Sequence, residues 1–477
     1  MGRARLGDGR RWGRRAVVVV LATVALAGRA AAHSGSLGGS VASATVPTWL
    51  TILTGGIVVG GSFLFTTLLT DHEAMRGVNW WRLGLLAPGR LGQVLVPLLR
   101  LGAFGVLLLV LATGFAGPQT PTRNFALLLV WVGWWAGYTA TTYLVGSTWS
   151  ALNPWLAPVT LLRRVGERVP SLGRAVGSRS VPDRWGVWPA VAGLLALVFL
   201  EVVSPVGQDP QLLAAVVLGY SLVTVAGAVV VGEAWFERVD PVSRVFAAYG
   251  RVAPLQRGED GGLSIRLPAT ALTEDPLADR AGEVAFVVAL LWVTTYDGLV
   301  ATPTWARAIT PLVELGVPAL LVYAVVLLAG FGAFFAVYRL AAGKVRDTAD
   351  TYVTTRAIER WFAPALLPIA AGYHLAHFLG YFLGLAPALA AVATSPLAPP
   401  ATTLALVLPG WFGTVKLICV LGGHVLAIWV AHSLAFELFP GVLAAIRSQY
   451  PSVVVMVFYT MSSLWVITQP YAPPPYV

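Results

Sequence analysis

Long apolar stretches, separated by short polar loops, are the feature that most constrains the fold of this 477-residue chain. A helix needs about 20 apolar residues to cross a bilayer. Charged residues make up only 11% of the chain, against roughly 25% in a soluble domain, which excludes an ordinary soluble fold. We therefore expect an all-α, polytopic transmembrane helical bundle of about ten spans, near residues 46–70, 94–116, 124–147, 186–203, 211–235, 283–302, 315–340, 361–385, 411–436 and 452–470.

The basic residues concentrate in alternate loops of this scheme. These loops are 71–93, 148–185, 236–282, 341–360 and 437–451, whereas the intervening loops hold almost no Lys or Arg. The alternation follows the positive-inside rule, which places the basic loops in the cytoplasm. It also explains the net charge of +10 without a nucleic-acid partner. We expect a protein of the plasma membrane, surrounded by lipid along its spans.

The first 32 residues have the three parts of a secretory signal peptide. A basic segment, 1–15, precedes the short apolar run 16–27, and an Ala-x-Ala cleavage site ends at Ala32. Cleavage after Ala32 would leave His33 as the mature N-terminus outside the cell. The alternative is an uncleaved first helix.

Residues 33–477 then form a single transmembrane domain, in which 236–282 is the longest polar segment. Phe246, Tyr249 and Val252 recur there at helical spacing, with arginines between them. This pattern predicts an amphipathic helix lying on the inner membrane surface, followed by a turn and a short extended piece.

Four of the six histidines fall inside predicted spans, where an ionisable side chain is rare without a partner or a ligand. His374 and His377 are separated by about 60° around a helix and about 4.5 Å along it. His424 lies at a similar depth in the next span. These three can supply nitrogen ligands to zinc or copper, to a haem, or can simply form interhelical hydrogen bonds. His432, further toward the inner side, predicts a separate site or hydrogen bond.

Acidic side chains and the N-terminus add further candidates. Asp297 is the clearest carboxylate inside a span, and we expect it to bind the metal, to orient a histidine or to act as a general base. Glu201 lies near the end of its span, where solvation or capping satisfies it easily. If the signal peptide is cleaved, His33 would offer an amine and an imidazole to one copper ion.

Several stretches together resemble a known family. They are STWSALNPW, the segment from Tyr220 to Leu255, VTTYDGLVATPTW and AGYHLAHFLGYFL. The chain resembles the fenitrothion hydrolase type of polytopic membrane protein from about residue 33 to about residue 470. The resemblance implies hydrolysis of an organophosphate triester with release of a phenol. In that interpretation His374, His377 and His424 would hold the metal, and Asp297 would bind it or accept the proton of a water.

Three functional hypotheses follow. The first is a metal-dependent membrane hydrolase acting on a small apolar ester. The second is a copper- or haem-handling protein for transport or electron transfer. The third is a transporter that uses the histidines as proton carriers. A tight cluster of the three histidines with Asp297 would favour the first, and a porphyrin-sized slot between histidines would favour haem.

Overall fold

The computed structural model describes residues 47–477, apart from 87–89, 169–175, 259–261 and 275. The predicted signal peptide and His33 lie outside the described residues. Within the described part, eight helices are long and apolar enough to cross a membrane. The chain is therefore an all-α, multi-pass membrane protein, as the apolar stretches predicted.

All ten predicted spans fall on helical segments. The long ones are α2 (Thr48–Thr66), α4 (Arg90–Ala116), α11 (Pro210–Val231), α14 (Glu283–Val300), α16 (Ala319–Ala349), α18 (Leu367–Ala393), α19 (Phe412–Leu438) and α20 (Val442–Thr468). Helix α17 (Thr355–Phe362) and the 3₁₀ turn η6 (Ala363–Leu366) lead directly into α18. Two shorter apolar segments complete the set: α10 (Trp188–Val203), and residues 125–144, which comprise α5 (Phe125–Leu127), the π-helix η2 (Leu128–Tyr138) and α6 (Thr139–Leu144).

The connections carry short elements. The helices are α3 (His72–Asn79), α7 (Trp149–Leu152), α8 (Leu156–Arg168), α12 (Ala234–Arg238), α13 (Pro241–Gly250) and α15 (Pro303–Glu314), and the 3₁₀ turns are η1 (Pro121–Arg123), η3 (Asp183–Trp185), η4 (Pro205–Gly207) and η5 (Thr270–Thr273). The strands are β1 (Leu83–Leu86), β2 (Leu255–Arg257) and β3 (Leu263–Ile265). They form one antiparallel sheet in the order β1–β3–β2, in which Ile265 pairs with both Leu83 and Leu255.

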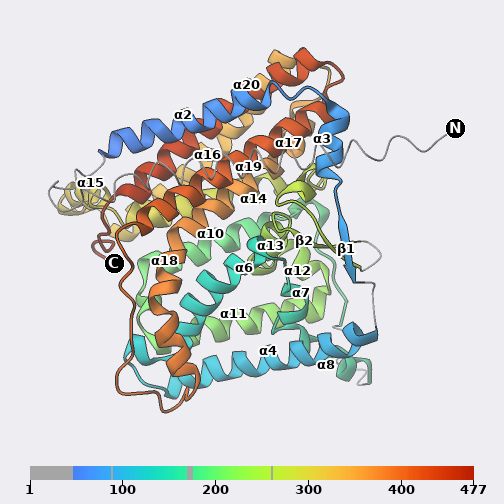
Figure 1. Cartoon of the computed structure of the whole chain (residues 1–477). Coiled ribbons are helices and arrows are strands. Elements are labelled where there is room, and N and C mark those ends of the chain that lie inside the picture. The colour runs from blue at the N-terminus through green and yellow to red at the C-terminus, as the bar shows by residue number, and fades with distance from the viewer. Residues whose placement is uncertain (1–46, 87–89, 169–175, 259–261, 275) are drawn as a thin grey trace, which may run out of the picture.

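The helix α14 lies at the centre of the bundle. It is apolar around its whole circumference, and 89% of its most apolar window is buried, as expected for a helix enclosed by other helices. It packs against α10, α16 and α18. The pairs α2–α20 and α4–α11 lie on opposite sides of the bundle (Figure 1).

Two glycines bring α18 and α19 into close contact. A Cβ atom added to Gly372 would lie 3.0 Å from Gly423 Cα, and one added to Gly423 would lie 2.4 Å from the Pro368 carbonyl oxygen. Small residues allow such approach of spanning helices. The contact fixes how α18 is rotated relative to α19, and therefore which way the histidines of α18 face.

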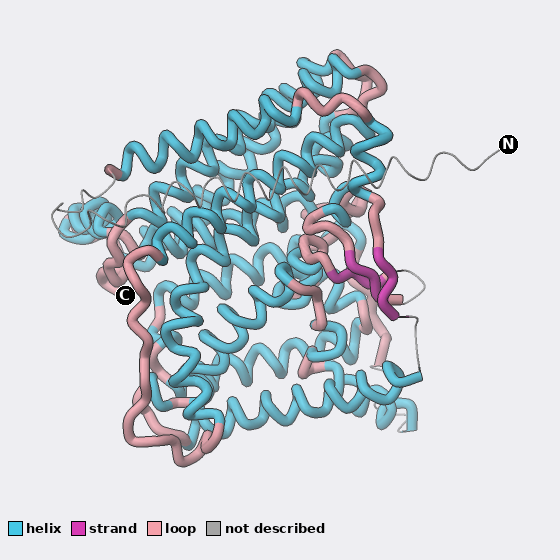
Figure 2. The backbone as a smooth tube through the Cα atoms, in the orientation of Figure 1, coloured by secondary structure: helices cyan, strands magenta, loops and turns pink. Residues whose placement is uncertain are grey.

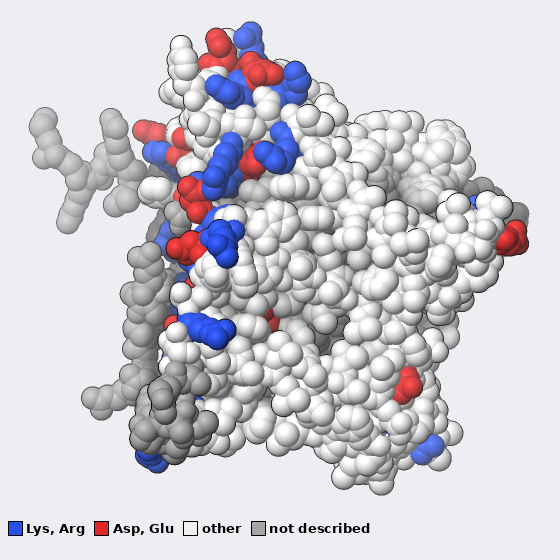
Figure 3. Space-filling model, turned by 180° about the vertical axis from the view of Figure 1, so that it is seen from behind, with Lys and Arg blue, Asp and Glu red and all other residues white. Residues whose placement is uncertain are grey.

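The charged side chains gather along one edge of the molecule, whereas the broad apolar face beside it carries almost none (Figure 3). The edge holds α3, α8 and the small sheet (Figure 2), and we call it the basic face. Ion pairs there include Arg356–Asp279 at 3.0 Å and Arg266–Glu274 at 2.7 Å. The alternate basic loops of the sequence thus share one side of the bundle.

The helix predicted to lie on the membrane is buried in the protein instead. Phe246 and Tyr249 are fully buried on α13, and Val252 just beyond it is 4% exposed. Asp240 caps this helix by accepting a hydrogen bond from Ser243 N at 2.9 Å. The apolar face of α13 therefore packs into the bundle, because aromatic neighbours there offer it a closer fit than lipid.

The helix α15 was not expected from the sequence. Thr302 caps it by accepting from Trp305 N at 3.1 Å, and Pro303 occupies its first turn. This combination is a recognisable helix start.

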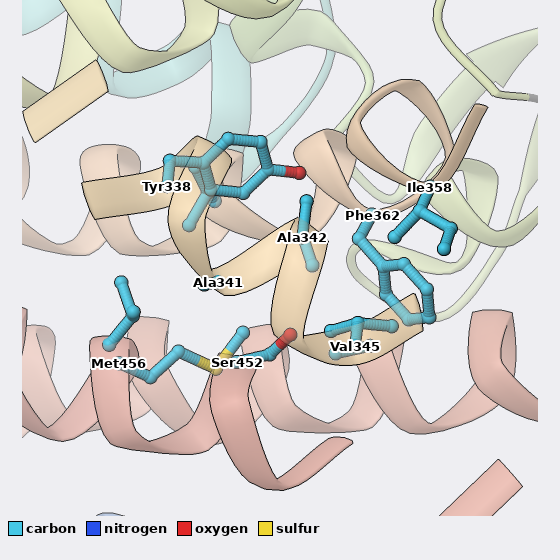
Figure 4. Close-up of a pocket in the computed structure, with 12 residues that line it drawn as sticks. Tyr338, Ala341, Ala342, Val345, Ile358, Phe362, Ser452 and Met456 are labelled. Atoms are coloured by element: carbon cyan, nitrogen blue, oxygen red, sulfur yellow. The ribbon is translucent and has the colours of Figure 1, made fainter. Parts of the chain in front are cut away.

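A small pocket of about 20 Å³ lies between α16, α17 and α20, lined by residues that include Tyr338, Phe362 and Met456 (Figure 4). It has room for no more than a water molecule.

Candidate functional site

His374 is fully buried among aromatic side chains. Its Nδ1 is hydrogen-bonded to the Tyr143 hydroxyl at 3.0 Å. The rings of Trp135 and Tyr249 contact it edge-on, at 5.3 and 5.9 Å between centroids. Its Nε2 has no hydrogen-bond partner among the described residues. His374 therefore faces α6 and α13.

His377 faces α14 and pairs with Asp297. Its Nε2 lies 3.2 Å from Asp297 Oδ2, and the two side chains are 28% and 21% exposed. Gly298 allows this approach, since a Cβ atom there would lie 2.6 Å from the Tyr373 hydroxyl. Tyr373 in turn stacks on the imidazole, with rings 14° from parallel. The predicted partnership of Asp297 with a histidine is therefore present.

His424 and His432 occupy separate environments. His424 Nδ1 donates to the Val420 carbonyl of its own helix at 2.8 Å, and its buried Nε2 has no partner among the described residues. His432 lies 2.9 Å from Gln449 Oε1 and 3.0 Å from the Leu69 carbonyl oxygen. His432 therefore links α19 to α20 and to the segment after α2. This agrees with the expectation that His432 forms a hydrogen bond apart from the other histidines.

The three histidines predicted to share a metal do not converge. His374 faces α6, His377 faces Asp297, and His424 bonds to its own helix. Among the described residues no group of three or more His, Cys, Asp or Glu side chains is placed to hold a metal ion. His33 lies outside these residues. The zinc or copper site therefore stays a prediction from the sequence.

Glu201 is a further acidic side chain inside the bundle. It lies half-buried on α10, which packs against α14, the helix that carries Asp297. Glu201 also lines a large cavity. It was expected to be solvated or to cap its helix because it lies near a predicted span end. The signal available in the sequence was its apolar setting, FLEVV.

The cavity has a volume of about 620 Å³ and is not closed on all sides. Its walls come from α4, η2, α7, α10, α11 and α13, and they are almost entirely apolar. Binding sites for small molecules are commonly of this size and character. Glu201 is the one Asp, Glu, Lys or Arg residue of the wall, and no histidine lines it. The cavity thus offers no histidine ligand to a haem.

A long π-helix forms part of this wall. The segment η2 contributes Trp131, Trp134, Trp135 and Tyr138. Stretches of π-helix occur often at functional sites because their wider turn re-aims side chains. Trp135 contacts both the cavity and His374, so the cavity lies directly beside the helix that carries His377.

Comparison with known proteins adds no assignment: no protein-family model, no curated protein and no solved structure matches this chain. The class established by the fold is a multi-pass helical membrane protein. Its function has to be inferred from the Asp297–His377 pair, from Glu201 and from the cavity.

Proposed function

We propose that this membrane protein hydrolyses small apolar esters, with Asp297 and His377 acting as the base. The observation that carries the proposal is the 3.2 Å contact between His377 Nε2 and Asp297 Oδ2. Asp297 lies on α14, which packs against α10, and Glu201 of α10 lines an apolar cavity. A neutral imidazole that carries its proton on Nε2, the nitrogen nearer the carboxylate, has a lone pair on Nδ1. Such a nitrogen is suited to take a proton from water.

The geometry is compatible with a simple hydrolytic step. His377 Nδ1 has no hydrogen bond among the described residues, and the side chain is 28% exposed. The proposed step requires a water molecule at this nitrogen. The water gives its proton to Nδ1 while its oxygen bonds to the carbonyl carbon or to phosphorus. The bond to the leaving alcohol or phenol breaks, and the leaving oxygen takes up the proton that His377 received from the water. Asp297 stabilises the imidazolium formed in between.

Two considerations support an ester as substrate. An uncharged ester partitions into the bilayer, where the apolar cavity wall is the matching environment. The resemblance to the fenitrothion hydrolase type points to organophosphate triesters, which belong to that class. The proposed location is the plasma membrane with the basic face in the cytoplasm, which places Asp297 toward the outer side.

The test is turnover of chromogenic esters by the protein in phosphatidylcholine nanodiscs. We expect 4-nitrophenol release from a dialkyl 4-nitrophenyl phosphate or a 4-nitrophenyl alkanoate. Asp297→Asn and His377→Ala should each lower kcat by about 100-fold or more, the usual contribution of a general base. Glu314→Gln, at an exposed position at the end of α15, is the matched control and should keep full activity.

The outcome that rejects the proposal is equally direct. Either no ester is turned over faster than in empty nanodiscs, or the Asp297→Asn protein is as active as the unaltered one. Metal content measured on the same preparation, with and without chelator treatment, tests the zinc or copper prediction separately.

A further inference from the structure

The cavity is elongated and opens toward lipid. On α4 its wall runs from Leu98 to Val110, which is about 18 Å along the helix axis. Leu98 and Val106 line the cavity and are also 59% and 43% exposed. Exposed apolar side chains on a spanning helix face the hydrocarbon of the bilayer. A molecule dissolved in the bilayer can therefore reach the cavity beside α4 without crossing a polar barrier.

Several polar groups in the wall are already paired. The Tyr220 hydroxyl donates to Asp240, the Trp155 Nε1 donates to Ser221 Oγ at 2.9 Å, and the Tyr138 hydroxyl bonds to a threonine. Two groups differ. Glu201 makes no hydrogen bond or ion pair with the described residues, and the buried Nε1 of Trp131 has no partner among them.

The carboxyl group of Glu201 is set to be a hydrogen-bond donor. Asp297 has an imidazole beside it, whereas Glu201 lies in an apolar wall and has no cationic side chain paired with it among the described residues. An apolar wall without a cation favours the uncharged form of a carboxyl group. Glu201 and the indole N–H of Trp131 would then both be hydrogen-bond donors on the cavity wall. Such donors match a ligand that carries an acceptor oxygen.

We propose that the carboxyl group of Glu201 donates a hydrogen bond to the carbonyl or phosphoryl oxygen of an uncharged, elongated ester that enters the cavity sideways from the bilayer past α4. This deepens the proposed hydrolase function and rests on it for the substrate class. Glu201 would then hold the reacting end of the ester next to the Asp297–His377 pair, while the apolar remainder fills the 620 Å³ space along α4. Charged amphiphiles would be excluded.

The test is photolabelling in phosphatidylcholine nanodiscs. One probe is methyl dodecanoate with a diazirine in its chain, and the other is dodecane with the same diazirine, which lacks an acceptor. We expect the ester to label peptides of α4, η2 and α10 more strongly than the alkane does. Glu201→Leu should lower ester labelling by about tenfold, the usual effect of removing a buried hydrogen bond. Glu201→Gln keeps a donor and should stay within about threefold of the unaltered protein.

A second pair of variants tests the cavity independently of Glu201. Gly102 lines the cavity and Gly105, on the same helix, does not; a Cβ atom at either position meets nothing within 4 Å. Gly102→Phe should fill the space and abolish labelling, and Gly105→Phe should leave it unchanged. Ester labelling that survives both Glu201→Leu and Gly102→Phe overturns the inference. Equal labelling by ester and alkane also overturns it, since the cavity would then hold ordinary acyl chains.

This experiment separates the two proposals. Asp297→Asn and His377→Ala should bind the ester probe normally even though they do not turn esters over. If the unaltered protein labels in a Glu201-dependent way but hydrolyses nothing, the hydrolase proposal fails while the binding site stands.

Discussion

Replacing Gly423 by alanine should separate α18 from α19 and destabilise the bundle. The new Cβ atom would lie 2.4 Å from the Pro368 carbonyl oxygen and 3.1 Å from Gly372 Cα. Carbon–oxygen contacts are comfortable only near 3.5 Å, so the helices must move apart by roughly 1 Å. Overpacking of this kind costs about 1–3 kcal/mol. We therefore expect the free energy of unfolding to fall by that amount.

The adjacent glycine provides a matched control. A Cβ atom on Gly422 meets nothing within 4 Å, so Gly422→Ala should be neutral or gain up to about 1 kcal/mol from helix propensity. Unfolding by SDS in mixed micelles, followed by circular dichroism, compares the two variants with the unaltered protein. Equal stability of Gly423→Ala and Gly422→Ala would refute the view that the glycine contact sets the spacing of these helices.

Two further predictions concern the basic face. Gly186 has φ of 49°, and a Cβ atom added to it would lie 2.0 Å from the Ala281 carbonyl oxygen. Gly186→Ala should therefore lower the free energy of unfolding by more than about 1 kcal/mol, measured by thermal unfolding. In the control Gly207→Ala the added Cβ meets nothing within 4 Å, and stability should be unchanged. Burial raises the pKa of Asp240 above its usual 3.8, so the folded state holds the proton more tightly than the unfolded state. The stabilisation that this tighter proton binding gives the folded state is complete below pH 3.8. It is lost as pH rises through the raised pKa of Asp240. Asp240→Asn should therefore show a smaller fall in unfolding midpoint from acidic to neutral pH than the unaltered protein, and identical falls would contradict this.

The positions of the spans could be predicted because the bilayer imposes a length. Each crossing needs a long apolar helix, and a run of about 20 apolar residues can be recognised directly in the sequence. The side chains that meet could not be predicted in the same way. A helix such as α14 is apolar on all sides, so no hydrophobic stripe indicates which face meets which neighbour.

The histidines show the consequence. Sequence spacing placed His374 and His377 on neighbouring faces of one helix, which left a shared ligand open. Packing sends them to different partners, Tyr143 and Asp297. The rotation of α18 that decides this comes from the contact between Gly372 and Gly423.

The sequence by itself determined that this is a multi-pass helical membrane protein with its basic loops on one side, since hydrophobic length and charge alternation are local properties. It also singled out Asp297 and His377. Only the tertiary structure paired these two residues and opened a cavity along α4 with Glu201 in its wall. Those features depend on how the helices rotate and pack, which in lipid is governed by close steric fit between helices and not by burial of a distinct apolar face.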